Sequence, residues 1–284
     1  VTGEGSEAVT VSDSAIDAAL LTAVNGATDQ LITLSSATSI SGEGDDIVAL
    51  YDANATNQLT GLDGDLTITI TGSTGALTTI VAADLLALDG DTTGLITIDP
   101  TATSISGSYS NVHDVLTQGK TRADADDATG VATPTISGLD NLAVTLTGTT
   151  SLAEYIDIQD NYTTGTITAT LEARTKAQIL EDSGTVTGDG VYDIVPGNDL
   201  KITVTDATFT AAELIAINGL TTGTVDLTHT ADANTPPAIT GSSTDLKTIF
   251  AAKVADGGDG FLTAAIGNAT SALTDTEVAA ADLV

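Results

Sequence analysis

The sequence predicts an α/β protein, a solenoid-like repeat array of strand-helix-strand units with parallel strands. Three observations predict it. β-Branched and hydroxyl residues alternate in four similar segments, a short helical pattern follows each segment, and a second alternating segment follows each helix. Alternation with a period of two is typical of strands, and strand, helix, strand at this spacing is typical of a right-handed crossover between parallel strands. A string of small α/β or β-sandwich domains is the alternative, because strand patterns alone do not show whether units stack.

The four first strands share one pattern and end at Asp or Gly. They begin at residues 9, 68, 144 and 202, so the intervals are 59, 76 and 58 residues. Self-similarity at such intervals is typical of repeat architectures. The predicted boundaries are repeat unit 1 at 1–65, unit 2 at 66–141 with a loop insert at about 119–133, unit 3 at 142–199, and unit 4 at 200–284 with a C-terminal cap or tail.

The helical pattern is clearest at 210–219. Thr210 stands at the N-cap position, Glu213 follows three residues later, and Gly219 ends the pattern, which is the arrangement of a capping box and a C-terminal glycine. Leu214 and Ile217 share one helix face, which we expect to pack in the core. Equivalent helices are predicted at 17–26, 82–90 and 152–158.

Two further signatures complete each unit. A Thr-Thr-Gly turn at 92–94, 163–165 and 221–223 precedes a second strand, and the second strands are predicted at 31–34, 95–98, 166–169 and 224–227. The motif Ile-Ser/Thr-Gly at 40–42, 105–107 and 239–241 precedes another helix, as at 243–250. Unit 3 is shorter, and its sequence predicts a helix over 171–180 directly after the strand.

The composition narrows the range of possible functions. Seven Lys and Arg against 39 Asp and Glu give a net charge of −32, which excludes the basic face that nucleic-acid binding needs and opposes docking on anionic membranes. The absence of Cys excludes disulfides, thiolate metal sites and cysteine nucleophiles. A hydrophobic content of 41% predicts a folded chain. No apolar run reaches the roughly 18 residues of a membrane-spanning helix, so we expect no membrane insertion.

Together these motifs resemble the degenerate Thr/Ala/Asp-rich repeats of giant secreted bacterial surface proteins. Such repeats are found beside haemolysin-type calcium repeats and in S-layer or adhesin-like proteins of marine and cyanobacterial species. The resemblance rests on the motifs at 202–206, 210–214, 221–227 and 239–246, and it covers nearly the whole chain. It implies a secreted, extracellular cell-surface location and a non-enzymatic structural role, and it brings no catalytic residue.

Calcium is the one cofactor that the sequence suggests. Residues 41–49 resemble one copy of the calcium-binding nonapeptide, which makes Asp45 and Asp46 candidate ligands. The alternative is a helix cap, because Asp46 aligns with Asn111 and Asp245 before similar helices. Asp256 and Asp259 form a second candidate in a Gly-rich loop, for which an ordinary solvated turn is the alternative.

No enzyme is predicted. The two histidines, His113 and His229, cannot form a three-imidazole zinc site and are interpreted as surface residues, and no common catalytic motif occurs. The leading hypothesis is a self-associating structural module of an S-layer, sheath or extracellular filament. The alternative is a calcium-dependent adhesin, a glycan-binding module, or a spacer that contacts neighbouring modules of the same protein.

Overall fold

A computed structural model of the chain describes residues 8–56, 58–62, 64–71, 79–120, 136–181, 194–227, 237–254, 260–262 and 269–275. The chain divides into two compact units. Unit A holds residues 1–145 and 162–165, and unit B holds residues 146–161 and 166–284. The boundary between them falls within one strand, β11 (Ala143–Thr150).

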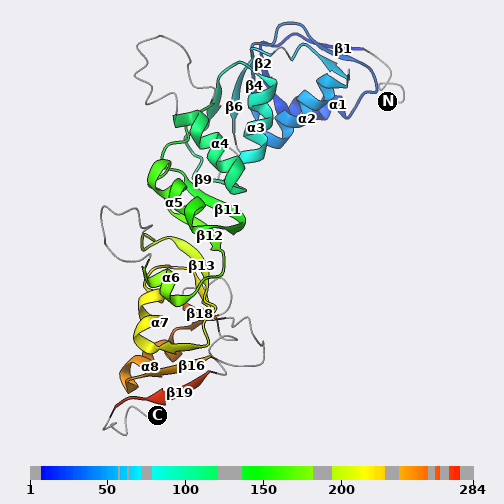
Figure 1. Cartoon of the computed structure of the whole chain (residues 1–284). Helices are drawn as coiled ribbons and strands as arrows, with labels where there is room; N and C mark the ends of the chain where they lie inside the picture. Colours follow the sequence, from blue (N-terminus) through cyan, green and yellow to red (C-terminus); the bar gives the residue numbers. More distant parts are fainter. Residues whose placement is uncertain are drawn as a thin grey trace, which may run out of the picture. The chain divides into compact units, whose positions relative to one another are not determined.

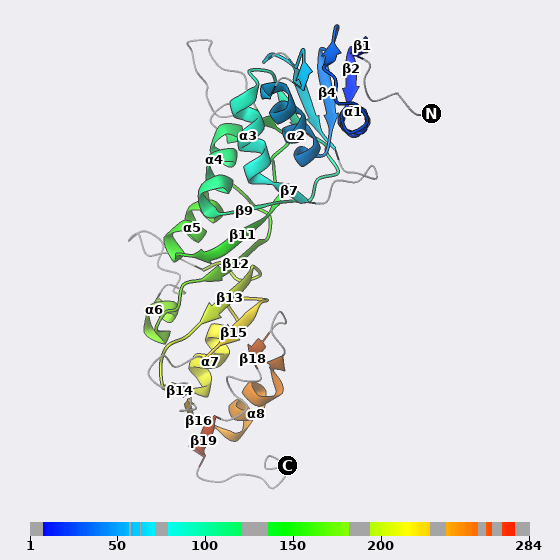
Figure 2. The ribbon, with the colours of Figure 1, turned by 90° about the vertical axis from the view of Figure 1, so that its right-hand side faces the viewer.

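Unit A alternates short strands with helices. Its elements are β1 (Val9–Val11), β2 (Ala15–Asp17), α1 (Ala18–Asn25), β3 (Ile32–Leu34), β4 (Ser39–Gly42), α2 (Gly44–Ala55), β5 (Leu59–Thr60), β6 (Thr67–Ile70), β7 (Thr79–Val81), α3 (Ala82–Asp91), β8 (Ile96–Ile98), β9 (Ser104–Gly107), α4 (Tyr109–Lys120) and β10 (Ile136–Ser137). The strands form the sheets β1-β3-β5 and β10-β8-β6-β4-β2, and β7 pairs with β9. All of these pairs are parallel. Helices α1 to α4 pack in chain order, each against the next (Figures 1 and 2).

Unit B repeats the pattern. Its elements after β11 are α5 (Leu152–Asn161), β12 (Ile167–Leu171), α6 (Lys176–Glu181), β13 (Asp199–Thr203), β14 (Thr208–Thr210), α7 (Ala211–Asn218), β15 (Thr224–Asp226), β16 (Ala238–Gly241), α8 (Ser243–Ala251), β17 (Lys253–Val254), β18 (Gly260–Leu262) and β19 (Thr270–Leu273). The parallel sheets run β17-β18-β15-β13-β12 and β14-β16-β19. Helix α7 packs between α6 and α8.

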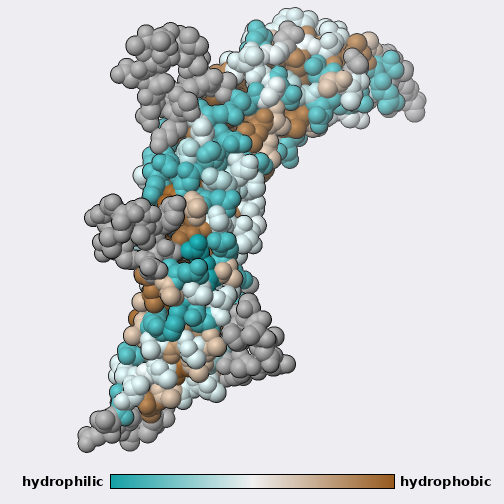
Figure 3. Space-filling view, in the orientation of Figure 1, coloured by the Kyte–Doolittle hydropathy of each residue, from teal (hydrophilic) through white to brown (hydrophobic). Residues whose placement is uncertain are grey.

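Isoleucines form a continuous ladder through the largest sheet of unit A. The strand registers place side by side Ile16, Ile40, Ile68, Ile96 and Ile136, and all five are buried. Burying one such side chain stabilises the fold by roughly 1.5–3 kcal/mol. Because successive side chains of a strand point to opposite faces, the alternating hydroxyl residues face away from this ladder. On the face shown in Figure 3, hydrophilic and neutral residues predominate, and hydrophobic residues form small separate patches.

The structure confirms the α/β class and the parallel strands. Helix α7 begins with the predicted capping box between Thr210 and Glu213, and Leu214 and Ile217 are buried as expected. The stacking of all units into one solenoid-like array stays a prediction. Of the loop insert at 119–133, the first two residues end α4 and the others lie outside the described residues. Of the C-terminal cap or tail, 276–284 also lie outside them.

One predicted helix is wrong in its extent. The sequence predicts a helix over 171–180, but β12 continues to Leu171, Arg174 forms a bridge with Val204, and α6 begins only at Lys176. Pairing with β13 holds 168–170 extended. The helix begins after Thr175, whose hydroxyl accepts from the Gln178 backbone N–H while the Gln178 side chain accepts from the Thr175 backbone N–H, which is a capping box. The Asp206 carboxylate also accepts a hydrogen bond from the Lys176 backbone N–H.

Candidate functional site: an acidic hollow between α2 and α3

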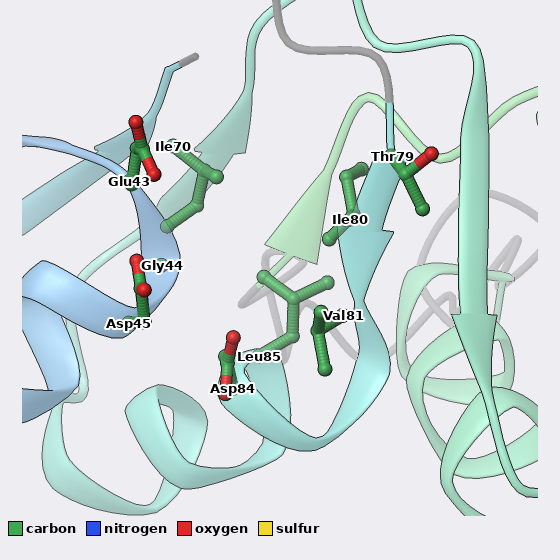
Figure 4. A pocket seen from close by; sticks show the side chains of 9 residues that line it. All are labelled: Glu43, Gly44, Asp45, Ile70, Thr79, Ile80, Val81, Asp84 and Leu85. Carbon is green, nitrogen blue, oxygen red and sulfur yellow. The ribbon is translucent and has the colours of Figure 1, made fainter. Parts of the chain in front are cut away.

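A hollow of about 410 Å³ lies in unit A between the start of α2 and the segment formed by β7 and α3 (Figure 4). Ile70, Ile80 and Leu85 supply apolar lining, and Glu43, Asp45 and Asp84 supply carboxylates. Gly44, Thr79 and Val81 complete the lining. Figure 4 shows that Asp45 and Asp84 come from the first turns of the two neighbouring helices. The hollow therefore combines an apolar wall with two facing acids.

Gly44 allows the two helices to approach closely at this point. A Cβ atom on Gly44 would lie 3.3 Å from the Asp84 Cβ and 3.5 Å from its Oδ2. The chain enters α2 through Glu43, which is extended and makes no side-chain capping bond. With Glu43 at the cap position, Asp45 and Asp46 both fall in the first turn of α2.

Carboxylates face each other at both ends of the α2–α3 pair. Burial raises the pKa of Asp84, and the negative charge of Asp45 raises it further. Burial and the charge of Asp52 raise the pKa of Asp91 in the same way. Asp52 follows Asp45 by seven residues, as Asp91 follows Asp84, and seven residues make about two turns, so each helix carries its acids on one face. The like charges oppose the packing of α2 on α3.

The same face buries a tyrosine. Tyr51 on α2 is only 6% exposed. Burial raises the pKa of its hydroxyl, Thr92 acts in the opposite direction, and the charges of Asp91 and Asp65 raise the pKa further. Two carboxylates of α3, those of Asp84 and Asp91, thus lie where burial and a neighbouring negative charge raise their pKa. Such settings attract protons or cations.

Of the four candidate calcium ligands, Asp45 and Asp46 lie in the first turn of α2. Residues 41–49 form the end of β4 and the start of α2, and the Asp45 Oδ1 accepts a hydrogen bond from the Asp46 backbone N–H at 3.0 Å. Asp256 and Asp259 lie outside the described residues. Within the part of the chain that the structure describes, no group of three or more His, Cys, Asp or Glu side chains is placed to hold a metal ion.

His113 is more than the surface residue that the sequence suggests. Its Nδ1 lies 3.2 Å from the Asp114 carboxylate, and its Nε2 lies 3.2 Å from the Tyr162 hydroxyl. The imidazole also contacts the rings of Tyr109 and Tyr162, with centroids 5.4 and 5.3 Å away. This aromatic cluster ties α4 to the segment after α5 within unit A. His229 lies outside the described residues.

Buried threonine hydroxyls join successive passes of the chain. The Thr221 hydroxyl donates to the Leu200 carbonyl at 2.7 Å and accepts from the N–H groups of Leu200 and Gly223, both at 2.8 Å. Thr92 and Thr163 make the corresponding bonds to the carbonyls of Leu66 and Leu142. The Thr-Thr-Gly motif signalled these turns, but not that the first hydroxyl would bond across to the preceding strand.

A single lysine organises the α6–α7 pair of unit B. The Lys176 Nζ donates to the Glu213 carboxylate and to the Thr208 carbonyl, both at 2.9 Å, and lies 5.6 Å from the centre of the Phe209 ring. Burial alone would raise the pKa of Glu213, but hydrogen bonds from the Thr210 backbone and Lys176 together lower it. The Lys176 ammonium group therefore neutralises the Glu213 charge between these two helices, and it also covers the edge of β14.

Comparisons with protein-family models, with curated proteins and with solved structures find no match to this chain. Among the residues that the structure describes, no helix is both long enough and apolar enough to cross a membrane.

Proposed function

We propose that the chain is a non-enzymatic structural module of a secreted cell-surface assembly, in which copies associate as an S-layer, sheath or extracellular filament. One observation carries the proposal: hydroxyl groups at equivalent places in the repeat, those of Thr92, Thr163 and Thr221, bond one pass of the chain to the pass before it. These bonds tie neighbouring passes of the chain together, which suits a structural role.

The open design of the sheets supports self-association. The edge strand of a parallel sheet presents unpaired N–H and C=O groups unless another segment covers it, and the two edges of such a sheet differ. Contacts between unlike edges are heterologous and produce open polymers when the rotation does not close a ring. The net charge of −32 opposes such contacts, so cations that screen or bridge carboxylates are expected to promote assembly.

Electron microscopy of the negatively stained full chain tests the proposal, once in chelator and once in millimolar calcium. Filaments or sheets in either condition are the expected result, and their appearance only with calcium would assign the switch to cations. Dispersed monomers in both conditions would contradict self-association. That outcome would favour the alternative, a spacer or a calcium-dependent adhesin or glycan-binding module, which a glycan-binding assay with and without calcium then separates.

A further inference from the structure

A strand-to-strand hydrogen bond recurs at three places in the repeat. In each, the residue that follows a strand or β-bridge donates its backbone N–H to the carbonyl of the last residue of the parallel segment paired with it. The three bonds join Thr71 to Gly42 at 2.8 Å, Thr205 to Arg174 at 2.9 Å, and Thr274 to Gly241 at 2.9 Å. The recurrence shows that this contact is a standard joint between repeats.

At two of these joints an aspartate extends the contact to a helix. Asp206 Oδ2 accepts a hydrogen bond from the backbone N–H of Lys176, the first residue of α6, and Asp275 Oδ2 accepts one from Ser243, the first residue of α8, both at 2.6 Å. The first N–H groups of a helix have no partner within it, and a carboxylate there also meets the positive end of the helix dipole. The Thr-Asp pair therefore clasps both a strand and a helix of the preceding repeat.

The half of this joint that consists of a strand end and an aspartate is also present at the start of unit A. Val11, Ser12 and Asp13 occupy the positions that Val204, Thr205 and Asp206 occupy in unit B. β1 pairs with β3 along one edge, and within the described residues no strand pairs with its other edge. Ser12 and Asp13 are both exposed.

An apolar side chain adjoins this half-joint. Leu20 is the third residue of α1. Asp84 and Glu213 are the third residues of α3 and α7, and each of these two acids faces the start of the preceding helix. Leu20 is 68% exposed, the largest exposed fraction among the large hydrophobic residues of the described chain. The start of unit A thus offers a strand edge, a carboxylate and an apolar contact on one side.

We propose that residues 9–13 of one copy dock on β16 and the start of α8 of a second copy, in the place that β19 and Asp275 occupy within a single chain. The docked Ser12 N–H donates to the Gly241 carbonyl, and Asp13 accepts from the Ser243 N–H. This inference rests on the proposed self-association and names the surfaces that carry it. Each copy contributes one donor edge and one acceptor edge, so the contact is head-to-tail.

β19 buries little side-chain surface. All four of its residues are exposed, including Leu273 at 46%, and it is held by pairing with β16 and by the bond between Asp275 and Ser243. The β1 sequence, Val-Thr-Val, has a higher strand propensity than the Ser-Ala-Leu of β19. The exchange replaces each bond with one of the same kind, so the strand sequence and the Leu20 contact must offset the freedom that a second copy loses on binding.

The test uses two substitutions that remove the same charge and act in opposite directions. Asp13→Ala removes the incoming clasp, and we expect the association constant of the full chain to fall about tenfold, the effect of losing one hydrogen bond to a charged group. Asp275→Ala loosens the resident strand and should raise that constant. Asp29→Ala, an exposed aspartate away from the joint, measures the effect of charge alone.

Sedimentation equilibrium on the three variants and the original chain gives the constants, and circular dichroism checks that each is folded. If Asp13→Ala is poorly folded, Ser12→Pro removes the donor N–H and serves in its place. An original chain that associates while both aspartate variants shift the constant in the same direction as Asp29→Ala would overturn the docking alone. An original chain that stays monomeric would overturn the proposed self-association as well.

Discussion

Two helix pairs solve the same packing problem in opposite ways. In α2–α3 and in α6–α7, the third residue of the later helix is an acid that faces the start of the earlier helix. Asp84 meets Gly44 and the charge of Asp45, and its pKa is raised by burial and by that charge. Glu213 meets Lys176, and its pKa is lowered. The difference teaches that one cation reverses the electrostatics of a repeat junction, in a chain with only seven Lys and Arg.

The largest effect is expected from the buried threonine hydroxyls, which both units contain. Thr221→Val and Thr92→Val each remove a buried hydroxyl and leave carbonyl groups of the preceding strand without a partner, which we expect to cost about 2–3 kcal/mol of unfolding free energy. Urea unfolding measures the loss. Thr222→Val is the control, because its hydroxyl is exposed and should cost less than about 1 kcal/mol. Equal losses in Thr221→Val and Thr222→Val would show that burial of the hydroxyl is not what matters.

Replacing Lys176 should make the α6–α7 contact of unit B resemble the α2–α3 contact of unit A. Lys176→Met keeps the apolar stem over Phe209 but loses the bonds to Glu213 and Thr208, and we expect a loss of about 1–2 kcal/mol. A double-mutant cycle with Glu213→Gln measures the coupling between the two side chains by urea unfolding. Strictly additive effects would contradict a direct interaction between them.

Acidification should move the two helix pairs in opposite directions. The raised pKa values of Asp84 and Asp91 mean that the α2–α3 contact is most stable at low pH and loses stability as the pH rises through those values. The lowered pKa of Glu213 means that the α6–α7 contact keeps its stability above about pH 4, near the ordinary glutamate pKa, and loses it below.

Hydrogen exchange read by mass spectrometry measures this difference, with protection corrected for the intrinsic rate at each pH. Between pH 7 and pH 4 we expect protection to rise in α3, and below pH 4 to fall in α7. High salt weakens interactions between exposed charges, so the gain in α3 should shrink there. A parallel change in both helices at every pH would show that net charge, and not these local contacts, controls the response.

The smallest effect is expected from neutralising one acid of unit A. Asp84→Asn removes the repulsion from Asp45 and the cost of burying a charge, and we expect the chain to gain about 0.5 kcal/mol at neutral pH. Thermal unfolding at pH 7 and pH 4 measures it, and the gain should shrink at pH 4, because the raised pKa favours protonation of the aspartate there. Asp29→Asn serves as the exposed control. A destabilised Asp84→Asn at pH 7 would show that the carboxylate favours the start of α3 more than Asp45 opposes it.

Local pattern was sufficient to predict much of the fold. The alternation at 68–72 predicted β6, the strand predicted at 202–206 overlaps only the end of β13 (Asp199–Thr203), and Thr210 with Glu213 predicted the start of α7. The Thr-Thr-Gly motif predicted turns in the right places. These features depend on residues within a few positions of each other, so their periods and caps can be recognised directly in the sequence.

The acidic hollow and the joints between repeats were not predictable in this way. Asp45 and Asp84 are 39 positions apart and meet only because α3 packs on α2, and Lys176 meets Glu213 only because α7 packs on α6. The helix expected over 171–180 was shortened by pairing with β13, and the Thr175–Gln178 capping box, a local signal that the prediction passed over, marks its start. The sequence by itself thus determined the class, the strands and most helices, through local hydrophobic period and capping. Only the tertiary structure decided which charges and hydroxyls face one another, because strand register and helix packing bring together residues that no local period relates.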